Sequence, residues 1–158
     1  MIRILLCGAN GKMGHVIASC VAERGNMESV AGIDLNTQTY GAFPIYRDFD
    51  SCDKEADVII DFSHHSALPA LLDFAEARHI PAVICTTGHT GEELERLARS
   101  AERIPVFYSR NMSLGINLLM ALCRRAAAAL GSDFDVEIVE KHHRNKLDAP
   151  SGTALMLA

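Results

Sequence analysis

Up to Tyr108, short apolar runs alternate with stretches whose apolar residues recur at helical spacing. Strand-type runs are predicted at 2–7, 29–34, 56–62 and 104–108, a strand with its turn at 81–88, and helices at 15–23, 66–79 and 90–99. This alternation predicts an α/β fold with a Rossmann-like, doubly wound parallel sheet. In such a sheet ligands bind at the carboxyl ends of the strands, where this sequence places polar turns.

After Tyr108 the pattern changes. A long helix is predicted from Leu114 to Leu130, and Gly131 is expected to end it. A strand-type run follows at 134–140. A further helix is predicted to begin at Ser151, whose hydroxyl is suited to cap it.

A glycine-rich loop, Gly8-Ala-Asn-Gly-Lys-Met-Gly14, joins the first predicted strand to the first helix. In dinucleotide-binding units such glycines permit a tight turn and close approach of the backbone to the pyrophosphate, although the spacing here is G-x-x-G-x-x-G rather than G-x-G-x-x-G. Asp34 ends the second strand 20 residues after Gly14, where an acid binds the ribose hydroxyls of NAD and repels the 2′-phosphate of NADP. The alternative for Asp34 is an ordinary carboxylate at a strand end.

The segment from Lys141 to Lys146 is strongly cationic in a chain whose formal net charge is −5, since five of its six side chains can carry positive charge. It precedes Ser151-Gly152-Thr153, which offer a capping hydroxyl and N–H groups at the positive end of a helix. The segment therefore predicts a site for a small, doubly anionic ligand, with imidazoles and an ammonium group that can donate protons. The alternative is a solvated basic loop.

Composition favours a soluble, cytoplasmic enzyme of about one domain. The acidic balance and the lack of aromatic residues between Lys141 and Thr153 argue against a nucleic-acid partner. No run approaches transmembrane length and no secretory segment is recognised, so no membrane partner is expected. The five cysteines lack metal-ligand spacing and are interpreted as reduced core thiols, and no metal is expected. Four histidines are assigned by position: His64 and His65 to the cofactor cleft, His79 and His89 to the surface.

Five segments of the chain form a recognisable set: Gly8–Gly14, Asp61–Ser63, Thr86–Gly88, Asn111–Asn117 and, above all, Glu137–Ala154 with its His-His-x-x-Lys-x-Asp-Ala-Pro-Ser-Gly-Thr sequence. Together they resemble the 4-hydroxy-tetrahydrodipicolinate reductase family, also called dihydrodipicolinate reductase. The resemblance spans essentially the whole chain. It implies an oxidoreductase that uses NADH or NADPH to reduce 4-hydroxy-tetrahydrodipicolinate, a small dicarboxylate, to tetrahydrodipicolinate in the diaminopimelate pathway of lysine biosynthesis.

By match to the family motif, the resemblance makes His142 a proton donor or acceptor and Lys146 a proton donor. The residues expected to bind the substrate are His143, Lys146, Ser151, Gly152 and Thr153. The residues expected to bind the cofactor are Gly8, Ala9, Asn10, Gly11, Lys12, Met13, Asp34, Cys85, Thr86, Thr87, Ser109, Arg110, Asn111 and Met112.

Two departures from the family bear on the cofactor. Cys85 stands where many members have glycine, and Leu35 follows Asp34 where a phosphate-binding arginine often stands. We therefore expect NADH to be favoured over NADPH. Two alternatives to the reductase stay open: a non-catalytic dinucleotide-binding module that senses redox state, and an aldehyde-oxidising dehydrogenase with Cys85 as its nucleophile.

The family has a second, substrate-binding domain of mixed sheet. The resemblance therefore divides this chain into a dinucleotide-binding domain at 1–113 and the opening of an α+β substrate domain at 114–158. On this basis the chain is expected to be an N-terminal fragment that is inactive alone. Its full-length parent is expected to be a homotetramer.

Overall fold

The computed structural model describes residues 1–144, 146 and 149–158. The chain divides into two compact units, which run from Met1 to Tyr108 (unit 1) and from Ser109 to Ala158 (unit 2).

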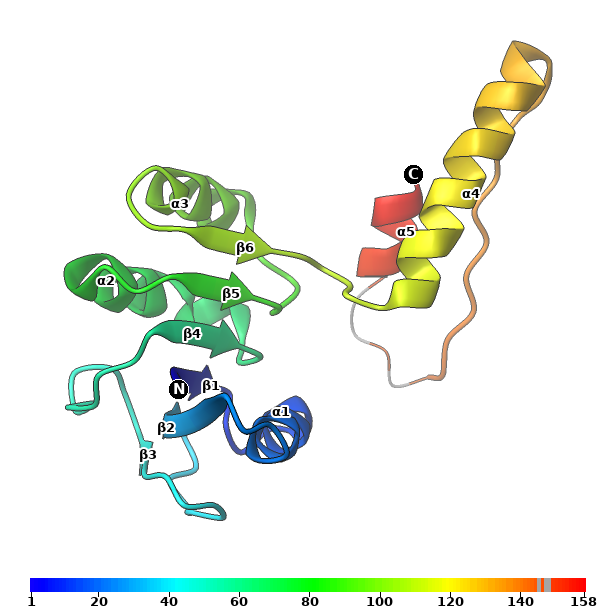
Figure 1. Cartoon of the computed structure of the whole chain (residues 1–158). Coiled ribbons are helices and arrows are strands. Elements are labelled where there is room, and N and C mark those ends of the chain that lie inside the picture. Colours follow the sequence, from blue (N-terminus) through cyan, green and yellow to red (C-terminus); the bar gives the residue numbers. More distant parts are fainter. Residues whose placement is uncertain (145, 147–148) are drawn as a thin grey trace. The chain divides into compact units, whose positions relative to one another are not determined.

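Unit 1 is built on a six-stranded parallel sheet in the order β3-β2-β1-β4-β5-β6 (Figure 1). The strands are β1 (Ile2–Cys7), β2 (Met27–Ile33), β3 (Ile45–Tyr46), β4 (Val58–Asp61), β5 (Ala82–Ile84) and β6 (Val106–Tyr108). The chain starts at the centre of the sheet and winds outward in both directions, as in the doubly wound dinucleotide-binding fold. The predicted fold class is therefore confirmed.

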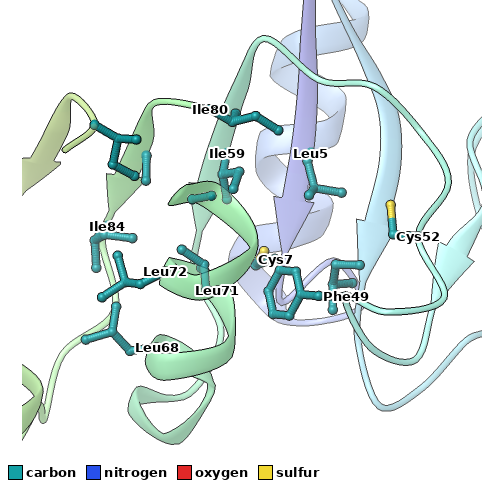
Figure 2. Packing of buried hydrophobic residues seen from close by; sticks show 14 of the residues in the cluster. Leu5, Cys7, Phe49, Cys52, Ile59, Leu68, Leu71, Leu72, Ile80 and Ile84 are labelled. Atoms are coloured by element: carbon teal, nitrogen blue, oxygen red, sulfur yellow. The ribbon is translucent and has the colours of Figure 1, made fainter. Parts of the chain in front are cut away.

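Helices cover both faces of this sheet. They are α1 (Lys12–Ala22), α2 (Leu68–Arg78), which follows a 3₁₀ turn η1 (His65–Ala67), and α3 (Gly91–Ala101). Because successive side chains of a strand point to opposite faces, β1 contributes Leu5 and Cys7 to the core under α2 and α3, and Leu6 to the core under α1. Figure 2 shows the first of these cores, with Leu71 of α2 packed among the strand residues. A strand buried on both faces needs apolar residues at successive positions, which explains the apolar run in the sequence.

The two-residue strand β3 was not predicted. It pairs with Gly32 and Ile33 of β2, and two residues are too few for any apolar period to be recognised. The start of α3, in contrast, was predicted from its capping residues. The Thr90 hydroxyl accepts the N–H of Glu93 (3.2 Å), and the Glu93 carboxylate accepts the N–H of Thr90 (2.7 Å).

Unit 2 contains α4 (Leu114–Leu130), a 3₁₀ turn η2 (Gly131–Asp133) and α5 (Gly152–Leu157). The predicted bounds of α4 are confirmed, and Gly131 follows it with a φ of +73°, a conformation that favours glycine. The predicted cap of α5 is also confirmed, because the Ser151 hydroxyl accepts the N–H of Ala154 (3.1 Å).

The strand predicted at 134–140 is wrong for this structure. The segment has no regular secondary structure, although Phe134 has extended backbone angles. A strand is stabilised by hydrogen bonds to a neighbouring strand, and the described part of unit 2 contains no strand that pairs with this segment. Its apolar side chains are correspondingly exposed, with Val136 71% and Val139 79% accessible.

The expectation that no segment approaches transmembrane length is also wrong. The helical stretch Leu114–Asp133 is 20 residues long, and 18 consecutive residues within it have a mean hydropathy of 1.3, enough by length and composition to cross a membrane. It is weak evidence for a membrane span, because Arg124 and Arg125 lie near its middle. An arginine at the centre of a spanning helix costs about 2.5–3.5 kcal/mol.

The cysteines only partly follow the prediction of core thiols. Cys7 and Cys52 are buried and Cys85 is partly buried, whereas Cys20 and Cys123 are exposed on α1 and α4. Exposure follows from the helical period, which turns some positions of each helix away from its packed side.

Candidate functional site

The glycine-rich loop between β1 and α1 is packed too closely for side chains at its first and last glycines. Gly8 has a φ of +73°, and a Cβ there would lie 2.5 Å from the carbonyl oxygen of Phe62. A Cβ at Gly14 would lie 2.3 Å from the carbonyl oxygens of Gly8 and Ala9. Glycine at these positions therefore lets the loop pass the end of β4 and lets α1 begin close against the start of the loop that follows β1.

The start of α1 is open to an anion. Its N-cap residue is Gly11, and no side chain caps the first turn, which begins with Lys12 and Met13. The free N–H groups of a first turn lie at the positive end of the helix dipole and suit a phosphate group. The predicted pyrophosphate-binding segment, Gly8 to Met13, thus has a geometry that fits a dinucleotide.

A cavity of about 530 Å³ opens at the carboxyl ends of β1, β2 and β4, and Gly8, Gly11 and Asp34 all line it. One carboxylate oxygen of Asp34 accepts the N–H of Asn10 (2.8 Å), and the other accepts the N–H of Asn36 (3.0 Å). A carboxylate oxygen has a second lone pair, so each can still accept a ribose hydroxyl. The structure therefore brings the glycine loop and the strand-end acid together in one cavity that fits a nucleotide.

Cys85, Thr86 and Thr87 form the turn that follows β5. Burial, with a smaller contribution from the Asp61 carboxylate, raises the pKa of the Cys85 thiol to about 11. A thiol with that pKa is protonated at neutral pH, which argues against an aldehyde-oxidising dehydrogenase with Cys85 as nucleophile. The Thr86 side chain is buried and its hydroxyl has no hydrogen-bond partner among the described residues, whereas Thr87 is exposed.

The carboxylate of Glu93 lies between two histidines. Nδ1 of His65 is 3.0 Å from Oε1 of Glu93, and Nδ1 of His89 is 3.7 Å from Oε2. The side chain of His89 is only 1% exposed, so its predicted place on the surface is wrong. Its ring packs edge-on against Tyr108 of β6, a contact that no local pattern reveals. Burial lowers the pKa of His89, so its ring is neutral at neutral pH.

Two of the other three histidines for which a place was predicted lie as expected. His64 lines the 530 Å³ cavity, as expected, and His79 is exposed at the end of α2. His65 pairs with Glu93 instead of lining that cavity. Across the described residues, no group of three or more His, Cys, Asp or Glu side chains is arranged to hold a metal ion.

In unit 2, the turn that precedes α4 is bonded to the first turn of α5. The side-chain amide of Asn111 donates to Oγ1 of Thr153 (2.9 Å), and Oγ of Ser109 donates to the Asn111 carbonyl (3.0 Å). A Cβ at Gly152 would lie 3.6 Å from the Cβ of Arg110. The structure therefore brings predicted cofactor residues of this turn, which comprises Ser109, Arg110, Asn111 and Met112, beside two predicted substrate residues of α5.

His142 is held by the carboxylate of Glu140, to which the sequence patterns assign no role. Nε2 of His142 lies 2.8 Å from Oε2 of Glu140, and Oε1 of Glu140 accepts the N–H of Ser151 (2.9 Å). Hydrogen bonds from Ser151, and then from His142, lower the pKa of Glu140 to about 2, so the carboxylate is charged at neutral pH. Glu140 thereby positions the imidazole beside the start of α5. The available signal was its place in the sequence, two residues before His142 at the edge of the cationic segment.

The N–H of Lys146 donates to the carbonyl of His143 (3.2 Å). Asn145, Leu147 and Asp148, which belong to the same motif, lie outside the described residues.

Comparison with known proteins assigns both units to one family. The family model described as "Dihydrodipicolinate reductase, N-terminus" matches residues 2–112, and the one described as "Dihydrodipicolinate reductase, C-terminus" matches residues 115–158. The 4-hydroxy-tetrahydrodipicolinate reductase of Caldanaerobacter subterraneus subsp. tengcongensis is 52% identical over the whole of this chain, and that of Clostridium tetani is 44% identical. The chain spans 62% of the length of each of these curated relatives.

One solved structure agrees with this assignment, and a second shares the fold. A dipicolinate-bound dihydrodipicolinate reductase from Paenisporosarcina sp. TG-14 matches 99% of this chain and 64% of its own, at 32% identity and a TM-score of 0.78. An oxidoreductase from Agrobacterium radiobacter, solved with NAD⁺, L-tartaric acid and magnesium, matches 80% of this chain and 41% of its own. At 18% identity and a TM-score of 0.63 it shows the fold alone. Because the two family models together cover both units of the structure, the chain belongs to the dihydrodipicolinate reductase family.

Proposed function

We propose that this chain carries the dinucleotide-binding domain (1–113) and the opening of the substrate domain (114–158) of an NAD(P)H-dependent 4-hydroxy-tetrahydrodipicolinate reductase. The enzyme acts in the diaminopimelate pathway of lysine biosynthesis. The observation that carries the proposal is the pair of bonds on Glu140, which holds the imidazole of a family motif at the start of a helix. An imidazole fixed in this way is suited to proton transfer with an anionic ligand.

The cofactor is held chiefly by unit 1 in this proposal. The N–H groups at the start of α1, together with Lys12, bind the pyrophosphate. Asp34 accepts the ribose hydroxyls in the cavity that it shares with Gly8 and Gly11. NADH or NADPH, when bound, supplies a hydride. By match to the family, the residues that complete the site are Cys85, Thr86, Thr87, Ser109, Arg110, Asn111 and Met112.

The substrate is a cyclic dicarboxylate, and the described relative from Paenisporosarcina was solved with the dicarboxylate dipicolinate. We assign its carboxylates to His143, Lys146 and the residues at the start of α5, Ser151, Gly152 and Thr153. His142 and Lys146 transfer protons: the 4-hydroxyl leaves as water, and a hydride and a proton are added to the ring. Protonated groups at these positions neutralise the negative charge that develops during hydride addition. Glu140 acts through His142, whose orientation it sets.

The setting of the enzyme follows from the same assignment. We propose a cytoplasmic protein that binds neither nucleic acid nor membranes, and whose full-length form is a homotetramer. The acidic net charge of −5 supports the first of these exclusions, and the paired arginines within α4 support the second.

The reaction is tested in a chimera in which residues 1–158 are followed by the part of the Caldanaerobacter reductase that lies beyond the matched region. We expect NADH oxidation that depends on 4-hydroxy-tetrahydrodipicolinate made in the same cuvette by its synthase. The readout is the loss of NADH absorbance, and the control omits the synthase. Binding of NADH without any substrate-dependent oxidation would instead support the redox-sensing module.

The preference for NADH is tested on the 158-residue chain by calorimetric titration of both cofactors. We expect NADH to bind at least as tightly as NADPH, and Asp34→Ala to weaken NADH binding about tenfold, the scale for losing hydrogen bonds to a charged group. The matched control is Asp50→Ala, an exposed carboxylate that does not line the cavity. A much tighter NADPH complex that Asp34→Ala leaves unchanged would contradict this assignment.

A further inference from the structure

Arg47 lies beside Asp34 at the edge of the sheet. In the parallel pair β2–β3, Ile33 is opposite Tyr46, and the N–H of Asp34 donates to the Tyr46 carbonyl (3.0 Å). Asp34 and Arg47 are the next residues after this pair, and neighbouring strands lie about 4.8 Å apart. The short strand β3 therefore delivers an arginine to the position next to the acid that is proposed to bind the ribose.

Arg47 also faces the same cavity as Asp34. Both line the 530 Å³ space with Gly8 and Gly11. Among the described residues that line this space, Arg47 is the only lysine or arginine. The Arg47 side chain is exposed, and it forms no ion pair within 4.0 Å in the described part of the chain. Its guanidinium is thus available to a ligand in this cavity.

Carboxylates surround this end of the cavity, so a phosphate group bound there needs a cation such as Arg47. Asp34 and Asp48, the residue after Arg47, contribute two carboxylates to the cavity. Hydrogen bonds from Ser51 lower the pKa of Asp48, so this carboxylate stays charged. A 2′-phosphate carries a charge of about −1.5 to −2 and would be repelled by these carboxylates. Leu35 offers no compensating charge, whereas an arginine fork can bind a phosphate through two parallel hydrogen bonds.

We propose that Arg47 is a specificity-determining residue that binds the 2′-phosphate of the adenosine ribose and so allows this chain to accept NADPH as well as NADH. The inference rests on the proposed dinucleotide site. It assigns the cation for the 2′-phosphate to the end of β3 instead of the position after the strand-end acid. NADH has no 2′-phosphate, so its binding does not depend on Arg47.

The test is calorimetric titration of NADH and NADPH into the 158-residue chain and its variants. We expect Arg47→Ala to weaken NADPH binding about tenfold while NADH binding changes less than about twofold, since one charge-assisted contact is lost from one ligand only. Arg47→Lys should recover part of the NADPH affinity because it keeps the charge but not the fork. The matched control is Arg99→Ala, an exposed arginine on α3 whose closest carboxylate, on Glu95, is 3.9 Å away.

The outcomes separate this proposal from the proposed function. NADH binding by the unmodified chain supports the dinucleotide site, and NADH binding by each variant shows that the variant is folded. If NADPH binds to Arg47→Ala as it does to the unmodified chain, or if both cofactors weaken equally, the role of Arg47 is overturned while the dinucleotide site stands. If the unmodified chain binds neither cofactor, the proposed function fails and the role of Arg47 fails with it.

Discussion

The variants His142→Gln and Lys146→Ala are each expected to lower the turnover of the chimera by about a hundredfold or more, the usual scale for loss of a positioned acid–base group. Glutamine can replace a hydrogen bond of the imidazole but cannot transfer its proton. Alanine at 146 removes the ammonium group altogether. NADH affinity should change less than about twofold, because neither residue lines the cavity that we propose to hold the ribose.

The controls come from the same cationic segment. Lys141→Ala and Arg144→Ala each remove a positive charge from an exposed residue to which we assign no role in proton transfer. If the segment has only a general electrostatic role, all four variants should lose turnover to a similar extent. If His142 and Lys146 transfer protons, only their two variants should be slow. Near-normal turnover in His142→Gln or Lys146→Ala would instead support the alternative that this residue belongs to a solvated basic loop.

The sheet of unit 1 could be predicted because the burial of its strands is visible in their own amino-acid sequence. Leu5, Leu6 and Cys7 are buried against helices on alternate faces, so burial requires an unbroken apolar run. The capping box at Thr90 and the glycine after α4 are equally local signals, since each depends on residues a few positions apart. Local chemistry of this kind can be recognised in a single sequence.

The run at 134–140 shows the limit of the same reasoning. An apolar pattern records which residues avoid water but not whether a neighbouring strand is present to bond with. The pattern here is real, yet within the described residues of unit 2 the run pairs with no strand.

The site residues that escaped prediction all depend on contacts between distant or unpatterned positions. Arg47 lines the same cavity as Asp34 through the pairing of a two-residue strand. His89, in the loop after β5, is buried and its ring contacts Tyr108 of β6. Glu140 joins His142 to Ser151 across a loop. These contacts match no known motif spacing, and the signal for Glu140 was only its place beside the cationic segment. The glycine loop and Asp34, in contrast, carry a known spacing and were found.

The 158-residue chain alone is expected to turn over substrate at least about a hundredfold more slowly than the chimera, because an active site held even ~1 Å too loosely loses that much. The chain contains His142 and Lys146, but the apolar side chains of the elements that carry the site are exposed to solvent. No residue of α4 is buried, and Leu114, Leu118 and Leu122 are 85%, 58% and 54% exposed. A groove of about 390 Å³, lined by residues such as Met120 and Ile138, lies open in the same unit.

Cofactor binding should survive in the same chain. The core of unit 1 is closed on both faces of its sheet, so we expect NADH affinity within about threefold of that of the chimera. The exposed apolar surfaces of unit 2 should also make the isolated chain associate, since large uncovered apolar patches find partners. Sedimentation at several protein concentrations measures that association.

The decisive comparison is turnover per chain at equal concentration for the isolated chain and the chimera, with the Caldanaerobacter reductase cut after the position equivalent to Ala158 as a matched control. If missing cover is the cause, the cut relative loses its turnover as well and keeps its NADH affinity. A cut relative that stays active beside an inactive 158-residue chain would place the defect in this chain's own residues. Equal turnover by the isolated chain and the chimera would show that α4 and α5 hold the site without further cover, and that the exposed leucines of α4 have no part in positioning it.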